Sequence, residues 1–309
     1  MPQTIQSIVC TIDFSPLSLP VARYGAALAR RAGARLYLVH AVNEPQDAAH
    51  PTALFERGGD LTRLTDQAGQ RMQALIDHAA VTWQAVVRFG DPVEETVAFV
   101  SHLPPCLVVS ASHGVSGLRR LLVGTVVERL TRALPHPMLV VKATDEPNAG
   151  PFEGFCSIVI GCDRRGGWQG LAALIPLIRS NGGVGLHLVH AMEDPLDDNP
   201  GASDALSYRQ VQQSHQERLS HRLYDQARRL FPGAGPLSVS VAPGDPEVMV
   251  REAAETHAAD LIVVGVRRSG KMGRWIAGST TEALLRRAPC SVLTVPEAPQ
   301  PPGSRGGRA

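Results

Sequence analysis

The stretch SIVCTID, residues 7–13, decides the fold, because it returns as SIVIGCD, residues 157–163. Each copy is a short apolar run that ends in an aspartate, which is typical of a buried strand. Further segments return in the same order, with an offset of 150 residues early and 154 later. They are LVHAV and LVHAM (38–42 and 188–192), FGDP and PGDP (89–92 and 243–246), CLVVSASHG and DLIVVGVRR (106–114 and 260–268), LLVGT and WIAGS (121–125 and 275–279), and ALPHPMLVV and RAPCSVLTV (133–141 and 287–295). Order and spacing together indicate a tandem duplication.

Each half alternates apolar runs with segments of helical periodicity. The strands expected in the first half are SIVCTI, ARLYLVHAV, VTWQAVVRF, CLVVS and PMLVV. Helices are expected at about residues 17–32, 61–79 and 125–133. A fourth should begin at Asp91-Pro92, with aspartate as N-cap and proline as the first helical residue, and Asp245-Pro246 repeats that signal. Near-continuous apolar strands separated by helices predict a parallel sheet with helices on both faces.

The expected architecture is therefore α/β, with two tandem domains that each contain a five-stranded parallel sheet. The expected bounds are residues 1–142 and 155–296, with a linker at residues 143–154 and a disordered tail at residues 297–309. A duplicated, dimer-forming domain can satisfy its own interface within one chain. We therefore expect a pseudo-twofold pair in which the fifth-strand runs PMLVV and SVLTV are covered.

Composition excludes several classes of partner. Of the 309 residues, 44% are apolar and 19% are charged, and the formal net charge is +1. Nothing electrostatic therefore favours a nucleic-acid or membrane-surface partner. No signal peptide is evident and no run of about 18 apolar residues occurs, so we expect a cytoplasmic protein. The five cysteines have no Cys-x-x-Cys spacing and lie in or beside apolar runs, so we expect buried, reduced thiols.

The loops after the fourth strand of each half carry the candidate site. In the second half, Gly265-x4-Gly270-Lys271 has the frame of a P-loop, but Met272 stands where that loop needs a hydroxyl for magnesium. The first half has Ser116-Gly117 at the matching positions, so the P-loop match is interpreted as accidental. Both halves share one spaced pattern: a small residue, a glycine position three residues later, and Gly-Ser/Thr after nine further residues. The positions are Ala111, Gly114, Gly124 and Thr125 in the first half, and Gly265, Arg268, Gly278 and Ser279 in the second.

This frame can cradle a phosphate. Glycines after a strand let backbone N–H groups approach an anion, and the final Gly-Ser/Thr adds the unpaired N–H groups of a helix start. The aspartate at the first strand end can accept from a ribose hydroxyl or an amine. The alternative is that the glycines make tight turns and the aspartate caps a helix.

On these residues the chain resembles a tandem member of the universal stress protein family. The segments that carry the resemblance are CTIDFSP, the strand ends His40-Ala41-Val42 and His190-Ala191-Met192, the repeated glycine frame, and the runs ALPHPMLVV and APCSVLTV. The resemblance implies Rossmann-like domains of the adenine nucleotide alpha hydrolase-like kind. It implies a stress-response protein that binds ATP, or else ADP or AMP, with magnesium entering only through the nucleotide. It also implies a homodimer in addition to the pairing within the chain.

The resemblance assigns site residues in both halves. In the first half they are Thr11, Asp13, Ala41, Ala111, His113, Gly114, Gly124 and Thr125. In the second half they are Asp163, Ala191, Gly265, Arg267, Arg268, Gly278 and Ser279. Asp13 would meet the ribose or adenine, the backbone at Ala41 would face the base, and the frame would surround the phosphates. Ala111 and Arg268 depart from the glycines of the nucleotide-binding members.

Two function classes stay open. One is a nucleotide-binding stress or regulatory protein, and the other is an interaction module whose pockets have degenerated. We expect no enzyme beyond slow ATP hydrolysis, because His113 has no patterned nucleophile beside it and residues 13–16 lack the Ser-Gly-Gly-x-Asp-Ser loop of related pyrophosphatases. A metal held by protein ligands alone is not expected, and His40 and His190 are interpreted as satisfied buried imidazoles. Gly114 favours the first pocket on backbone grounds. The basic residues Arg267, Arg268, Lys271 and Arg274 argue for the second.

Overall fold

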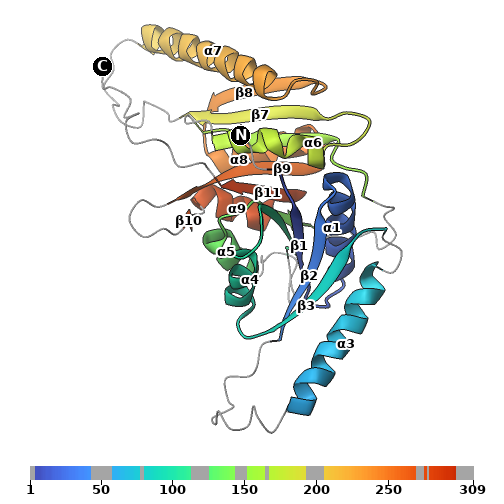
Figure 1. Ribbon diagram of the computed structural model, residues 1–309. Coiled ribbons are helices and arrows are strands. Elements are labelled where there is room, and N and C mark those ends of the chain that lie inside the picture. Colours follow the sequence, from blue (N-terminus) through green and yellow to red (C-terminus); the bar gives the residue numbers. More distant parts are fainter. Residues whose placement is uncertain are drawn as a thin grey trace.

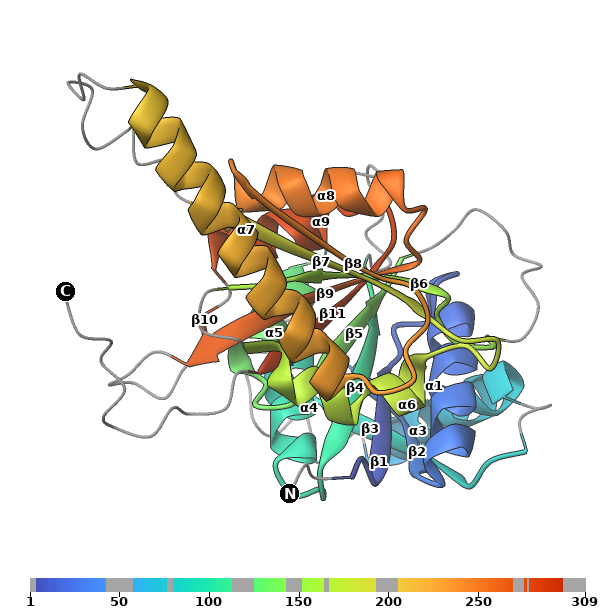
Figure 2. The same ribbon diagram turned by 90° about the horizontal axis from the view of Figure 1, so that it is seen from above.

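The computed structural model describes residues 4–42, 58–76, 80–112, 125–142, 152–163, 167–192, 205–268, 275–276 and 278–296. Figure 1 shows a twisted central sheet that runs through the whole molecule, and Figure 2 shows it from above with helices on both faces. Within the described part of the chain, no helix combines the length and the apolar composition that a membrane span requires.

The first half forms a five-stranded parallel sheet in the order β3-β2-β1-β4-β5. Its strands are β1 (Ser7–Thr11), β2 (Arg35–Val42), β3 (Trp83–Phe89), β4 (Cys106–Ala111) and β5 (Met138–Val141). Its helices are α1 (Ser18–Ala32), α3 (Gly58–Ile76), α4 (Pro92–Val100) and α5 (Thr125–Ala133). The predicted α/β fold is confirmed, and the helix expected at 61–79 begins three residues earlier.

The second half repeats this sheet in the order β11-β9-β6-β7-β8. Its strands are β6 (Ser157–Gly161), β7 (Gly185–Met192), β8 (Leu237–Pro243), β9 (Leu261–Arg268) and β11 (Ser291–Pro296), with β10 (Trp275–Ile276) antiparallel to β9. Its helices are α7 (Ala205–Leu230), α8 (Pro246–Thr256) and α9 (Ser279–Arg287). In place of a helix like α1 it has the 3-10 segment η1 (Gly167–Ala173) and the short α6 (Ile175–Ile178). Gly167, Gly170 and Pro176 explain the change, since both residue types disfavour a helix interior.

Both aspartates expected to start a helix do so. Oδ1 of Asp91 accepts from the backbone N–H groups of Val93 and Glu94 at the start of α4. Oδ1 of Asp245 accepts from the equivalent groups at the start of α8. The two caps differ in one respect, because Arg129 on α5 adds an ion pair to Asp91 at 2.8 Å. Its hydrogen bonds hold the pKa of Asp91 below the ordinary value.

The two halves are joined edge to edge by their fifth strands. β5 and β11 pair antiparallel, with Leu139 opposite Leu293 at the centre of the contact. The prediction that these edges are covered within a pseudo-twofold pair is confirmed. Reciprocal ion pairs flank the joint: Arg132 meets Glu282 at 2.5 Å, and Arg286 meets Glu128 at 2.7 Å. Each pair links α5 to α9, so the same contact is made twice across the pseudo-twofold axis.

One apolar core lies on each face of the sheet, and each core extends through both halves. The first includes Leu28 of α1 and Leu177 of α6, and the second includes Val100 of α4 and Leu284 of α9. A further contact comes from Arg31, which donates to the carbonyls of Leu177 and Arg179 beyond the linker. Apolar side chains of each half are therefore buried in cores that also contain side chains of the other half.

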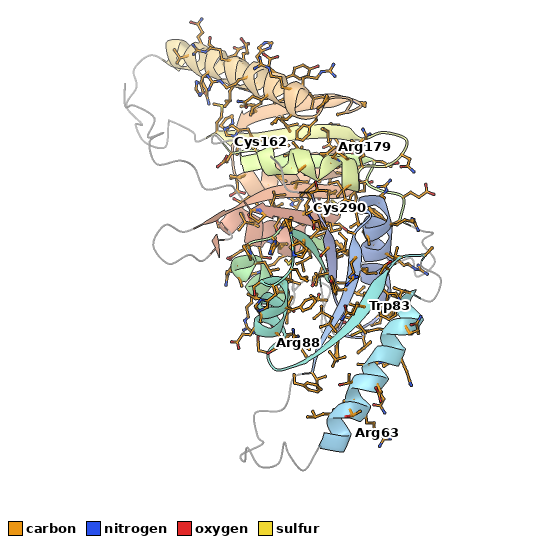
Figure 3. All side chains as sticks on the ribbon, in the orientation of Figure 1. Arg63, Trp83, Arg88, Cys162, Arg179 and Cys290 are labelled. Atoms are coloured by element: carbon orange, nitrogen blue, oxygen red, sulfur yellow. The ribbon has the colours of Figure 1, made fainter. Side chains whose placement is uncertain are left out.

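The cysteines are reduced, as predicted, but they are not all buried. Cys10, Cys106 and Cys162 are buried and Cys290 is half-buried, whereas Cys156 is exposed. Figure 3 labels Cys162, directly after β6, and Cys290, directly before β11. Burial raises the pKa of the Cys106 and Cys290 thiols to about 12. Cys156 directly precedes β6, so it lies before the buried apolar run of that strand.

Candidate functional site

A hydroxyl pair marks the carboxyl edge of the first sheet. The chain leaves β1 toward β2 on one side, while β4 lies on the other side, so the strand order switches between β1 and β4. The register places Thr11 beside Ser110, and the Thr11 hydroxyl donates to Oγ of Ser110 at 2.8 Å. Ser110 is buried, so the floor of this switch point is polar. Ser110 was not among the predicted site residues.

The equivalent floor in the second half is apolar. There the switch lies between β6 and β9, and Gly161 and Val264 take the places of Thr11 and Ser110. A Cβ on Gly161 would lie 3.4 Å from side-chain carbons of Val250 and Val264, so these two valines line the space. The duplication therefore has one polar and one apolar switch point.

Asp13 follows β1 and shapes the turn into α1. Its Oδ1 accepts from the backbone N–H of Ser15 at 2.9 Å and from the Ser18 hydroxyl at 3.0 Å. Phe14 between them has φ +61°, which is left-handed backbone for a bulky residue. The alternative that this aspartate caps the helix is not met, because the N-cap position of α1 is Leu17 and no side-chain hydrogen bond caps the helix. A carboxylate offers about four acceptor positions, so these two donors are compatible with a ligand hydroxyl as a further donor.

The remaining described positions of the first half lie along the same edge. Ala41 is near the end of β2, where it pairs with Arg88 of β3, and Ala111 ends β4 beside Val141. Figure 3 labels Arg88 on β3. Thr125 is the first residue of α5. The predicted residues His113, Gly114 and Gly124 lie outside the described residues.

In the second half, Asp163 and Ala191 occupy the strand ends that correspond to Asp13 and Ala41. Gly265 lies inside β9, paired with Val295 of β11. Gly278 is the N-cap of α9, and no side chain among the described residues caps the helix there. Ser279, the first residue of α9, is exposed, so this helix start presents backbone N–H groups to an anion.

The second-half loop begins later than the sequence predicts. Arg267 and Arg268 continue β9 and pair with Ile276 and Trp275 of β10. Gly265 and Val266 pair with β11, and Arg267 and Arg268 pair with β10, so all four residues are held in extended strand structure. Residues 265–268 therefore cannot wrap a phosphate as the first part of a P-loop, which agrees with the accidental interpretation. Gly270 and Lys271 lie outside the described residues.

Two histidines make the same contact in the two halves. Nδ1 of His40 lies 2.7 Å from the carbonyl oxygen of Ile12, and Nδ1 of His190 lies 2.8 Å from that of Cys162. Because a carbonyl oxygen only accepts, Nδ1 carries the hydrogen in both rings. The prediction of satisfied, buried imidazoles holds in part: Nδ1 is hydrogen-bonded in both rings, but His40 is only half-buried. The buried Nε2 of His190 has no partner among the described residues. Among the described residues, no group of three or more His, Cys, Asp or Glu side chains could hold a metal ion.

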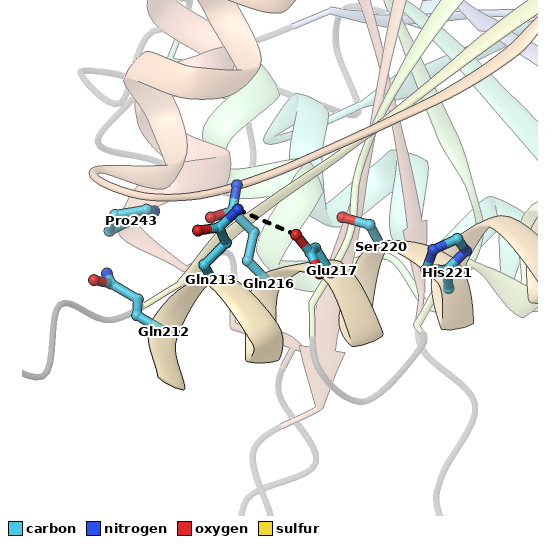
Figure 4. A pocket seen from close by; sticks show the side chains of 7 residues that line it. All are labelled: Gln212, Gln213, Gln216, Glu217, Ser220, His221 and Pro243. Carbon is cyan, nitrogen blue, oxygen red and sulfur yellow. Dashed lines mark hydrogen bonds between the residues drawn. The ribbon is translucent and has the colours of Figure 1, made fainter. Parts of the chain in front are cut away.

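A polar groove of about 560 Å³ lies elsewhere, between α7 and the end of β8 (Figure 4). Three of its seven lining side chains are amides, and two of these are already used: Gln213 donates to Glu217, and Gln216 donates to the carbonyl of Val241. The groove is at the outer edge of the sheet, away from both switch points. It does not coincide with the predicted site.

The comparisons agree with this geometry. The profile of the universal stress protein family matches residues 4–142 and again residues 156–296. The chain belongs to the universal stress protein family. A universal stress protein of Methanocaldococcus jannaschii is 28% identical to this tandem universal stress protein over 142 residues, which are 44% of this chain and 82% of that protein.

Solved structures share the whole tandem fold. A universal stress protein from Archaeoglobus fulgidus superposes with a TM-score of 0.63 at 18% identity, over 94% of this chain and 98% of that one. A functionally unknown protein from Pseudomonas aeruginosa gives 0.59 at 18% identity, over 96% and 94%. At this identity the superpositions show that the fold is shared.

Proposed function

We propose that this universal stress protein binds an adenine nucleotide, ATP before ADP or AMP, at the carboxyl edge of its first half. The observation that carries the proposal is the hydrogen bond between the Thr11 and Ser110 hydroxyls at the switch in strand order. Thr11 lies two residues before Asp13 in the chain. Hydroxyls and a carboxylate suit a ribose, and the helix start at Thr125 suits a phosphate. The donor set therefore fits the ligand that the family resemblance implies.

The role that follows is regulatory. We propose a cytoplasmic stress-response protein in which nucleotide occupancy alters shape or partner binding, with at most slow hydrolysis. Magnesium would enter with the nucleotide. The proposed domains are residues 1–142 and 155–296, with residues 143–154 as linker and 297–309 as tail. Because β5 and β11 already cover each other, a homodimer would use a different surface.

The first pocket is proposed as the stronger site. The switch point of the second half has Gly161 and Val264 where the first half has the hydroxyls of Thr11 and Ser110. A ligand hydroxyl buried against valines there would lack a hydrogen-bond partner. Arg268 lies in strand β9 and pairs with Trp275 of β10, so its backbone is extended and the backbone argument that favoured the first pocket does not apply at this position. Asp163, Ala191, Gly265, Arg267, Gly278 and Ser279 would form the weaker site.

The test is an ATP titration of the full chain with matched aspartate variants. Asp13→Ala should abolish or strongly weaken tight binding, whereas Asp163→Ala should leave it within about threefold of wild type. Lys271→Ala should also have a modest effect, as expected for one partly solvated charge. Loss of binding in Asp163→Ala with Asp13→Ala unchanged would reverse the order of the sites. Complete loss in a folded Lys271→Ala variant would restore the P-loop interpretation.

A second candidate function is that of an interaction module whose pockets have degenerated, so that the protein acts through dimerisation and no longer binds nucleotide. The observations in its favour are Ala111 and Arg268, which replace two glycines of the frame. Wild-type protein that binds none of ATP, ADP, AMP or cyclic AMP in equilibrium dialysis would decide for this candidate. Saturable binding of one of them decides for the first.

A further inference from the structure

His40 contacts the residues on both sides of Asp13. It donates from Nδ1 to the carbonyl oxygen of Ile12, and its ring centroid lies 4.5 Å from that of Phe14. The guanidinium carbon of Arg71, on α3, lies 3.8 Å from the Phe14 ring centroid. The backbone before Asp13 and the side chain after it are therefore both tied to neighbouring elements.

The turn that these contacts hold is a strained one. A bulky residue at φ +61° has left-handed backbone, which is unfavourable and persists only where its surroundings determine it. That conformation at Phe14 brings the Ser15 N–H to 2.9 Å from Oδ1 of Asp13. If Phe14 relaxed to negative φ, this hydrogen bond would be lost and the carboxylate would turn. The direction of the Asp13 carboxylate thus depends on what holds Ile12 and Phe14.

In the second half, a histidine makes the equivalent hydrogen bond although one of its ring nitrogens is buried without a partner among the described residues. His190 donates to the carbonyl of Cys162, directly before Asp163, and is only 3% exposed. Its Nε2 is buried and has no hydrogen-bond partner among the described residues. An aliphatic side chain would fill this space without a buried unpaired nitrogen. Compared with an aliphatic side chain, the His190 imidazole adds the hydrogen bond to the carbonyl of Cys162.

We propose that His40 is a positioning residue of the nucleotide site: it fixes the Ile12–Phe14 turn so that the Asp13 carboxylate faces the ligand's ribose. In the second half His190 makes the corresponding bond to the carbonyl of Cys162, beside the switch point that has no hydroxyls. This inference rests on the proposed function, because it concerns the same pocket. His40 acts through Asp13 and does not itself contact the nucleotide.

The experiment measures ATP affinity of the full chain by isothermal titration calorimetry. His40→Phe keeps a ring against Phe14 but removes the donor, and should weaken binding at least about tenfold. His40→Asn keeps an N–H donor close to the same position and should lose less. The matched control is His190→Phe, which should leave the affinity within about twofold. Equal losses in His40→Phe and His40→Asn would overturn the role of the hydrogen bond.

A positioning role also predicts non-additivity. In an Asp13→Asn background, His40→Phe should cause little further loss, because the carboxylate that it orients is already gone. A full, additive loss overturns the inference. If His40→Phe does not fold, Phe14→Leu takes its place, since it removes the ring contacts of the turn; unchanged ATP affinity in that variant overturns the inference as well.

The two possible failures are distinguishable. Wild-type protein that binds no ATP refutes the proposed function, and the inference falls with it. Wild-type protein that binds ATP with an affinity unchanged by His40→Phe refutes the inference alone.

Discussion

Gly25 in α1 lies so close to β1 that a single methyl group should destabilise the protein. A Cβ at this position would lie 2.1 Å from Sγ of Cys10 and 3.2 Å from Cδ1 of Leu36. Favourable contacts between heavy atoms lie at about 3.5–4.0 Å, so the sulfur would have to move by more than an ångström. Cys10 and Leu36 are fully buried, which leaves them no solvent to move into.

The expected magnitude follows from two opposing effects. Overpacking a buried site costs about 1–3 kcal/mol. Replacing a helical glycine by alanine contributes about 0.5–1 kcal/mol in the other direction. With an overlap this severe, Gly25→Ala should lower the free energy of unfolding by about 2 kcal/mol. Gly69→Ala in α3 is the matched control, because nothing lies within 4 Å of its added Cβ. It should be neutral or stabilising by about 0.5–1 kcal/mol.

Urea unfolding followed by circular dichroism measures these differences as shifts in the midpoint. Cys10→Ala removes the clashing sulfur, together with its contact to the carbonyl of Val21. The double variant Cys10→Ala, Gly25→Ala should therefore be more stable than Gly25→Ala alone, with a coupling energy of about 1–2 kcal/mol. Gly25→Ala at the wild-type midpoint, or a double variant no more stable than the single one, would refute the reasoning.

Two further predictions concern the second half and the joint. The rings of His187 and His257 stack at 3.6 Å, and burial followed by the charge of His257 lowers the pKa of His187 below the ordinary 6.5. Unfolding then takes up a proton, so stability should fall as the pH drops below about 6.5, and it should be independent of this pair above that value. Tyr37 and Leu103 hold the matching positions in the first half, so His187→Tyr with His257→Leu should flatten the pH dependence of the urea midpoint; an unchanged slope would contradict the assignment. At the joint, Arg132→Glu should lower the midpoint by placing like charge against Glu282, and adding Glu282→Arg should restore it, less so in high salt. A double variant no better than the single one would show that the pair contributes nothing.

Much of the fold follows from local signals in the sequence. The duplication, the apolar strands and the starts of α4 and α8 could be predicted, because a strand needs a buried run and a helix start needs a cap. Asp91 and Asp245 each satisfy two backbone N–H groups of their own helix, so the neighbouring residues suffice to identify them. Asp13 and Asp163 could be placed at strand ends because each directly follows a repeated apolar run.

Other features depend on which strands become neighbours, and a local pattern cannot state that. Ser110 looks like one more small residue of a buried strand until the sheet order sets it beside Thr11. The hairpin that keeps Arg267 and Arg268 in β9 requires β10, a strand of two residues that carries too short a pattern to detect. Gly25 and Cys10 are 15 positions apart, and only the packing of α1 on β1 brings them together.

The sequence by itself determined two parallel α/β halves, since burial on both faces dictates the apolar runs and their spacing. The tertiary structure decided that the halves share one sheet, through the antiparallel pairing of β5 with β11 around Leu139 and Leu293. It also decided that the two switch points differ, with hydroxyls in one and valines in the other. The physical reason is that the contacts between these strands join residues far apart in the sequence, 99 positions for Thr11 and Ser110 and 154 for Leu139 and Leu293. Such pairing is fixed only when the chain has folded.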